Sequence, residues 1–238
     1  MLNTRRVEIT WLGHACLRVR SGGKVFYIDP LLTGNPLCPE AEKSPTACDA
    51  ILLTHGHADH VGDTLPLAQR SGAQVVAMVE LAGYLGAQGL ARDRLVAANK
   101  GGTFAVAGAQ VTMVHADHSS SIDHDGQPVY LGEPAGYVVE FAEGLRVYFA
   151  GDTAVFGDMR LIGEIYRPEV AVLPIGGFYT MDPREAAVAC RLLGVPAVIP
   201  IHFGTWPVLA GTPAELRQHL SAAGTPCEVV ELRPGQTI

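Results

Sequence analysis

The chain has 238 residues, of which 48% are hydrophobic and 17% charged, and its formal net charge is −7 at pH 7. This composition predicts a globular protein with a small-molecule partner, since an acidic chain without a basic run is poorly suited to capture nucleic acid. The opening residues lack a signal-like apolar run, and Glu80 and Arg191 interrupt the longer apolar segments, so no membrane span is expected and the cytoplasm is the expected location.

The first half of the chain alternates apolar runs with two helical patterns. Strands are predicted near residues 7–11, 16–20, 24–29, 50–54 and 74–77, and helices near residues 62–69 and 80–88. The turn RSGGKV joins the second and third of these runs, which predicts a β-hairpin.

The second half continues the strand and helix pattern without an evident linker, so one domain is expected over residues 1–238. Strands are predicted near residues 110–115, 136–141, 145–150, 170–174, 197–201 and 228–232, and helices near 156–165, 183–193 and 213–222. The sequences DPRE and TPAE each place proline after an N-cap residue and glutamate three residues after the cap, which is typical of a capping box. These halves predict an α/β fold with two face-to-face sheets and helices on both outer faces.

The stretch LLTHGHADHVGD, residues 52–63, places three histidines and two aspartates within nine positions. Histidines can cluster by chance or line a wet surface, but these follow directly on the apolar strand run DAILLT. The end of a strand can aim His55 and His57 at one metal, and Asp59 and His60 at another, as the chain turns into a helix. Imidazole and carboxylate suit zinc, manganese and iron, so the motif predicts a metal site.

Three more candidate ligands follow predicted strands: His118 after QVTMVHA, Asp152 after LRVYFAG, and His202 at the end of AVIPIH. Scattered histidines have no reason to fall at strand ends, whereas a site built from loops at one sheet edge needs ligands there. The pattern predicts two metals with Asp152 between them. The first has His55, His57 and His118, and the second has Asp59, His60 and His202.

With these residues in view, the sequence resembles the metallo-β-lactamase fold superfamily of metal-dependent hydrolases. Its HxHxDH signature reads HGHADH here, DHSS carries His118, GDT carries Asp152, and PIHFGTWP carries His202. The segments WLGHACLRV, IDPLLTGNP and LPIGGFYTMDP look like the branch of ascorbate-6-phosphate lactonase-like proteins, with a more distant likeness to N-acyl phosphatidylethanolamine phospholipase D. The resemblance implies a four-layer αββα sandwich and a binuclear site, normally Zn²⁺, with Mn²⁺ or Fe²⁺ as alternatives.

The expected activity is hydrolysis by a hydroxide that bridges two metals, with Asp59 and Asp152 as catalytic residues. A small ester, first of all a lactone, is the favoured substrate, and a phosphodiester is the alternative. A nuclease would need a basic groove that this acidic sequence does not display. A di-iron redox protein would need an electron partner, and a non-catalytic metal-binding protein is disfavoured because every expected ligand is present.

Several neighbours of the motifs allow two interpretations. His115 competes with His118 as a ligand, but it lies within the predicted strand, and the family resemblance favours His118. His14 matches a family position and is placed among the substrate-binding residues, with a structural role as the alternative. Asp29 either orients a ligating imidazole from behind, which we favour, or ends its strand in an ordinary turn.

Substrate contacts are expected from Phe178 and Tyr179 and from the loops over residues 31–49 and 119–134. The five cysteines are odd in number and lack a CxxC pair, so reduced thiols are expected. The sequence leaves the oligomeric state open, a homo-oligomer included.

Overall fold

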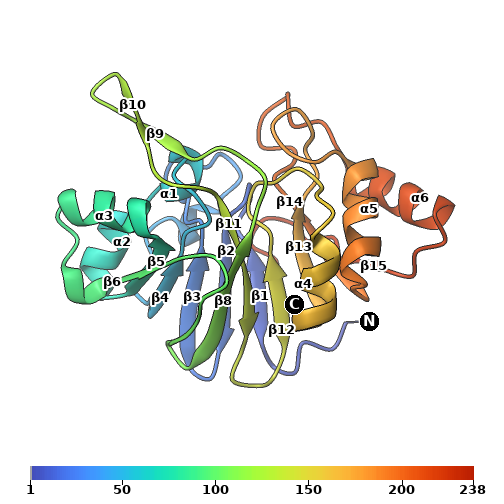
Figure 1. Ribbon diagram of the computed structural model, residues 1–238, viewed down its shortest axis with the longest axis horizontal. Helices are drawn as coiled ribbons and strands as arrows, with labels where there is room; N and C mark the ends of the chain where they lie inside the picture. Colours follow the sequence, from blue (N-terminus) through green and yellow to red (C-terminus); the bar gives the residue numbers. More distant parts are fainter. Residues whose placement is uncertain (1) are drawn as a thin grey trace.

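Two β-sheets lie face to face in the computed structural model, which describes residues 2–238, and helices cover the outer face of each sheet (Figure 1). This arrangement confirms the four-layer αββα sandwich of the α/β class. Among residues 2–238, no helix combines the length and apolar character that a membrane crossing requires.

The first sheet has six strands in the order β1-β2-β3-β4-β5-β6. Its first three strands pair antiparallel, and the pairs from β3 to β6 are parallel. Gly22 and Gly23 form the predicted hairpin turn between β2 and β3, with φ angles of 57° and 75° that favour glycine. The strands are β1 (Glu8–Trp11), β2 (Leu17–Ser21), β3 (Lys24–Ile28), β4 (Ala50–Leu52), β5 (Gln74–Met78) and β6 (Leu95–Ala98).

The second sheet has seven strands in the order β15-β14-β13-β12-β11-β8-β7. The pairs from β12 to β15 are parallel, and β11 and β7 are each antiparallel to β8. Strands β13 and β14 are buried along their whole length, as parallel strands covered on both faces should be. The strands are β7 (Thr103–Val106), β8 (Ala109–His115), β11 (Ala135–Glu140), β12 (Arg146–Phe149), β13 (Val170–Pro174), β14 (Ala197–Ile201) and β15 (Glu228–Val229).

The helices form the two outer layers. Helices α2 and α3 contact the first sheet, and α4, α5 and α6 pack beside one another over the second. Both predicted capping boxes are present, at Asp182 before α5 and at Thr212 before α6. The helices are α1 (Ala58–Val61), α2 (Thr64–Ser71), α3 (Val79–Ala87), α4 (Met159–Tyr166), α5 (Pro183–Leu193) and α6 (Pro213–Ala222), with short 3-10 turns at Glu40–Glu42 and Arg92–Arg94.

The larger buried cluster lies between the sheets, where side chains such as Ile9 and Phe26 belong to the same core as Val139 and Ile199. A second cluster fills the space between the second sheet and its helices. The hydroxyl of Tyr137 donates a hydrogen bond of 2.6 Å to the carbonyl of Leu53, which ties β11 to the segment after β4. The expectation of one domain over residues 1–238 stays a prediction.

Some predicted bounds were wrong. The helix expected near residues 62–69 begins only at Thr64, because Gly62 adopts φ 40° and ends α1. The strand expected over residues 228–232 stops at Val229. Strands β6 and β7 were not predicted. Residues 119–134, expected as a loop, contain β9 (Ser121–His124) and β10 (Gln127–Tyr130), which form a hairpin that projects from the body (Figure 1).

Candidate metal centre

The candidate metal ligands all follow the carboxyl ends of strands that share one edge of the sandwich. The motif residues come directly after β4, partly on α1, whereas the others follow β8, β12 and β14. The structure brings together the seven ligands predicted from the sequence: His55, His57, Asp59, His60, His118, Asp152 and His202.

Ligand atoms in each of three sets lie within 4.8 Å of one another. The first set, His55, His57 and His118, is the one predicted for the first metal. The second holds the three ligands predicted for the second metal and adds His14. The third joins His55, His60 and Asp152, so the sets share members and form one continuous cluster.

Asp152 lies at the centre of the cluster and is buried. Its Oδ2 atom is 3.3 Å from Nε2 of His60 and 3.2 Å from Nε2 of His202. The same oxygen is 3.7 Å from Nε2 of His118, which belongs to the first set. One carboxylate oxygen therefore faces imidazoles of both predicted metal positions.

Asp29 contacts the side of the His60 ring that faces away from Asp152. This position supports the interpretation that Asp29 orients a ligating imidazole. Its Oδ2 atom is 2.8 Å from Nδ1 of His60, so Nε2 of that ring is left to face Asp152. The same oxygen accepts a hydrogen bond of 2.6 Å from the hydroxyl of Thr54, which lies 3.0 Å from Nδ1 of His55. Partners of this kind fix the ring orientation of metal-binding histidines.

His14, the fourth member of the second set, is completely buried. Its Nε2 atom is 3.0 Å from Oδ2 of Asp59, and its Nδ1 atom is 3.1 Å from the hydroxyl of Thr205. Its ring also packs on that of His202, with centroids 4.1 Å apart. A substrate contact through His14 stays a prediction, and the contacts present support a role in orienting Asp59.

Burial shapes the protonation of the first set. It lowers the pKa of His55 well below the ordinary value of 6.5, and it also lowers the pKa of His57 and of His118. These imidazoles are therefore neutral at pH 7, which is the form that coordinates metal.

The carboxylates of the cluster are ionised. Burial alone would raise the pKa of Asp152, but the neighbouring His60 and His202 hold it well below its usual range. For His60, burial lowers the pKa, but Asp152 and Asp29 outweigh this effect and raise it. A metal ion can take the place of the proton that these two carboxylates draw onto His60.

Buried polar atoms of the cluster indicate that it is suited to bind metal. Nε2 of His60, Nε2 of His202 and Oδ1 of Asp152 are buried and form no well-aligned hydrogen bond within residues 2–238, although both nitrogens lie within 3.3 Å of Oδ2 of Asp152. Buried polar atoms without partners are unfavourable, and these are atoms that bind divalent transition metals. The residues present therefore fit a metal centre.

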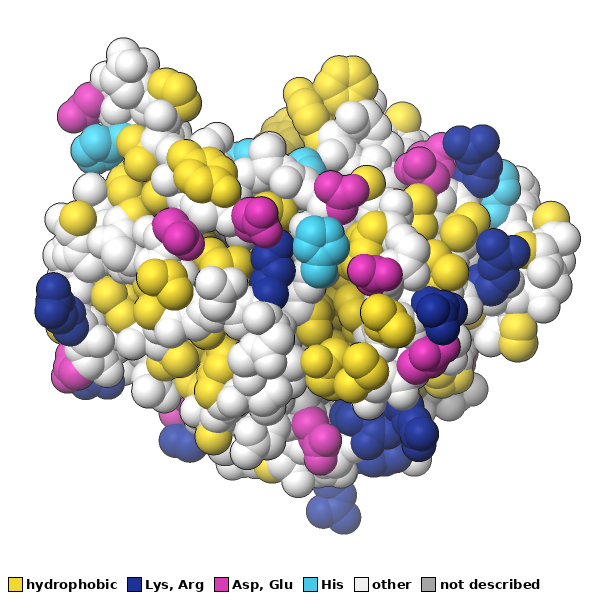
Figure 2. Space-filling view, in the orientation of Figure 1, with side chains coloured by type: hydrophobic (Ala, Val, Ile, Leu, Met, Phe, Trp, Pro, Cys, Tyr) yellow, Lys and Arg dark blue, Asp and Glu magenta, His cyan; other side chains and the backbone are white. Residues whose placement is uncertain are grey.

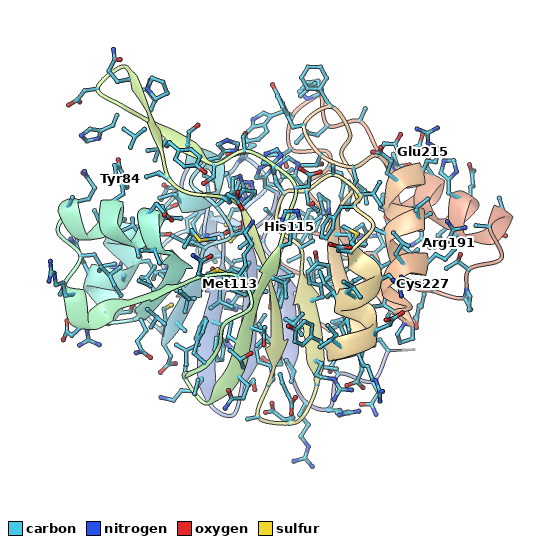
Figure 3. All side chains as sticks on the ribbon, in the orientation of Figure 1. Tyr84, Met113, His115, Arg191, Glu215 and Cys227 are labelled. Carbon is cyan, nitrogen blue, oxygen red and sulfur yellow. The ribbon has the colours of Figure 1, made fainter. Side chains whose placement is uncertain are left out.

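A cavity of about 560 Å³ opens over the cluster. Metal-ligand side chains, Ser119 and Tyr179 are among the residues that line it. Phe178 lies outside this cavity and is 77% exposed, so a substrate contact through it stays a prediction. His115 ends β8 and faces away from the cluster, where its Nδ1 atom lies 3.2 Å from Nζ of Lys100 (Figure 3).

Sequence reasoning missed several side chains around the cluster. Thr54 directly precedes the ligand His55 in the sequence, so its hydroxyl could have been predicted to contact that ligand or its neighbours. Ser119, whose hydroxyl lies 3.3 Å from Nε2 of His57, stands in the DHSS segment that was quoted only for its histidine. Thr205 and Trp206 follow His202 along the chain, but their contacts with His14 depend on the tertiary fold.

This fold and this cluster define a metal-dependent hydrolase of the metallo-β-lactamase class. The family model described as the beta-lactamase superfamily domain matches residues 25–203, and the chain belongs to that family.

Individual relatives agree with this assignment. A UPF0173 metal-dependent hydrolase of Rubrobacter xylanophilus is 50% identical over 233 residues, which cover 97% of this chain and 96% of the relative. Another, from Methanopyrus kandleri, is 46% identical over 233 residues, 97% of this chain and 99% of the relative. The solved structure of Igni18, a metallo hydrolase from Ignicoccus hospitalis, is 36% identical, covers 98% of this chain and 97% of its own, and superposes with a TM-score of 0.84.

Proposed function

We propose that this hydrolase holds two divalent metal ions and cleaves a small ester, with a lactone as the leading substrate class. The observation that carries the proposal is the position of Asp152, whose Oδ2 atom lies 3.2 to 3.7 Å from imidazoles of both predicted metal positions. A carboxylate placed in this way is suited to bridge two ions. Zn²⁺ is the proposed metal, and Mn²⁺ and Fe²⁺ are the alternatives.

Two metal ions at this site would supply a hydroxide nucleophile near neutral pH and Lewis acidity toward the scissile carbonyl. The chain supplies orientation. Asp59 is held by the hydrogen bond from His14, and its side chain stays 35% exposed toward the cavity. Burial alone would raise the pKa of Asp59, but His14 and His60 lower it by more, so the carboxylate is ionised at pH 7 and able to hold an ion.

The size of the cavity supports a small-molecule substrate. At about 560 Å³ it falls within the range of ligand pockets of a few hundred to about a thousand cubic ångströms. Ser119 also lines this cavity, where its hydroxyl can contact a substrate oxygen. The cytoplasmic location stays a prediction, and the oligomeric state stays open.

A substrate screen of the zinc-loaded protein tests the proposal. The panel contains γ-lactones, p-nitrophenyl esters, bis-p-nitrophenyl phosphate and single-stranded RNA. We expect turnover of lactones or esters that a chelator abolishes and added Zn²⁺ restores. Turnover confined to the phosphodiesters, or ester turnover that survives complete removal of metal, would contradict the proposal.

A further inference from the structure

One side of the cavity is apolar, and the loops after β13 and β14 build it. We define the apolar wall as Phe178, Tyr179, Trp206 and Val208. Three of these residues line the cavity, and Phe178 stands beside it, with its ring centroid 4.6 Å from that of Tyr179. Metal-ligand side chains line the same cavity, so a molecule held at the cluster can extend onto the wall.

The side chains of the wall are unusually exposed for large hydrophobic residues. Phe178 is 77% exposed, Tyr179 59%, and Trp206 and Val208 38% each, although most large hydrophobic side chains of this chain are buried. Figure 2 shows hydrophobic side chains gathered at the top of the molecule, over the loops that follow β13 and β14. A contiguous apolar patch beside a ligand site is a mark of binding.

The backbone holds the wall in place. Phe178 adopts φ 62°, a left-handed conformation that is strained for a bulky residue and is often found at functional sites. Behind it, a side chain at Gly176 would meet the carbonyl of His202 at 2.2 Å, and the amide of Gly211 donates to the carbonyl of Gly176. The two loops are therefore locked together and to a metal ligand, so the wall has a fixed position relative to the cluster.

The charges around the cavity set a second condition on the substrate. Within residues 2–238, no lysine or arginine side chain lines the cavity. Arg184 lines a neighbouring hollow that contains Phe178 and Val208 but no metal ligand. Inside the cavity itself, an anionic group remote from the scissile bond, such as the phosphate of a sugar phosphate, would have no lysine or arginine partner, which is unfavourable.

We propose that the substrate is an ester or lactone with an uncharged alkyl or aryl group that packs on the apolar wall. This inference rests on the proposed function, because it takes the scissile carbonyl to lie at the metal cluster. Phe178 and Tyr179 are then specificity-determining residues, which discriminate by the apolar surface they cover.

Two probe series test the proposal on the zinc-loaded protein. The first is hydrolysis of p-nitrophenyl acetate, butyrate and octanoate, with mono-p-nitrophenyl succinate as the anionic counterpart of the butyrate. The second is calorimetric binding of acetohydroxamate, hexanohydroxamate and octanohydroxamate, which anchor to the metal without being hydrolysed. We expect kcat/KM and affinity to rise by about two- to fourfold per methylene group, as partial to full burial of each group implies, and the succinate to be the poorer substrate.

Matched double variants locate the effect. In Phe178→Ser/Tyr179→Ser, we expect the dependence on chain length to flatten in both series. Leu161→Ser/Ile165→Ser removes two exposed apolar side chains from α4, which are 40% and 64% exposed, and should keep the wild-type dependence. Because all four side chains are partly or largely exposed, both variants should fold.

The outcomes separate the two proposals. Affinity that does not change with tail length, the same dependence in Phe178→Ser/Tyr179→Ser as in the wild type, or a preference for the succinate would overturn the apolar contact. No ester or lactone turnover, with a retained hydroxamate dependence, would overturn the proposed hydrolysis and support the apolar contact.

Discussion

The Nε2 atom of His14 lies 3.0 Å from Oδ2 of Asp59, in a contact that joins the turn after β1 to the metal motif. The backbone carbonyl of His14 also accepts a hydrogen bond of 2.9 Å from the amide of His202. One buried residue thus links the turn between β1 and β2, the HxHxDH segment and the final ligand. Its protonation should therefore affect both the fold and the site.

The first prediction concerns the pH dependence of stability in the metal-free protein. Burial lowers the pKa of His14 to about 4, against opposition from its hydrogen bond to Asp59, whereas the unfolded chain titrates near 6.5. Between these values the unfolded state binds more protons, so the free energy of unfolding rises with pH and is lost as pH falls from 6.5 toward 4. The full effect of this residue is about 3 kcal/mol.

Urea unfolding of the wild type and His14→Asn across this pH range measures the contribution. His60, His202 and Asp59 also face His14, so the difference between the two proteins, rather than either curve alone, reports on this residue. We expect the difference to shrink as the solution becomes more acidic. A difference that stays constant from pH 7 to pH 4 would show that His14 titrates normally.

The second prediction is that each chain binds about two metal ions, because the ligand sets on either side of Asp152 can each hold one. Elemental analysis after repletion with zinc, manganese or iron, followed by gel filtration, measures the ratio. At most one tightly bound ion under every condition would exclude a binuclear centre.

The third prediction concerns the bridge. Asp152→Ala should abolish metal-dependent hydrolysis while leaving the fold largely intact, because it removes a ligand rather than an apolar core side chain. Asp158→Ala is the matched control, since Asp158 is exposed and makes no side-chain capping bond to α4. Turnover assays and circular dichroism decide the matter, and unchanged turnover in Asp152→Ala would refute the role.

The fourth prediction separates His118 from His115. His118→Ala should lose metal and activity together, because its ring lies with those of His55 and His57. His115→Ala should change stability slightly and leave metal binding in place, because His115 contacts Lys100 and Phe156 instead. Metal affinity and turnover are measured for both variants. Retained metal in His118→Ala with loss in His115→Ala would reverse the assignment.

The fifth prediction concerns the support behind the ligands. Asp29→Asn keeps the shape of the side chain but removes the charge that faces His60, so metal affinity should fall about 10- to 100-fold. Asp63→Asn is the control, because the Asp63 carboxylate accepts hydrogen bonds from the backbone amides of Leu32 and Thr33 and contacts no proposed metal ligand. Competition with a chromogenic chelator gives both affinities, and equal affinities would argue against the supporting role.

The sequence predicts best where local pattern and tertiary packing agree. The capping boxes at Asp182 and Thr212 fix the starts of α5 and α6, and the apolar runs of β13 and β14 match their observed bounds. Strands β6 and β7 escaped prediction because each has only four residues and is only partly buried, so neither stands out as a core strand.

The ligands were predictable because each follows a recognisable strand, whereas their supporting contacts were not. The hydrogen bond between His14 and Thr205 joins residues 191 positions apart, and the local sequence around either residue does not indicate this contact. Similarly, the polar β9 and β10 hairpin is mostly exposed on both faces, so its alternation gives no hydrophobic signal.

The division of ligands between the two sheets bears on how the protein is made. The HxHxDH segment follows a strand of the first sheet, but Asp152 and His202 follow strands of the second and are synthesised much later. A nascent chain that ends before β14 carries an incomplete chelator, however well its first sheet has formed. Because only His202 of the proposed ligands comes after β14, capture of the second ion is tied to that strand, and a fully loaded centre distinguishes finished molecules from chains truncated before it.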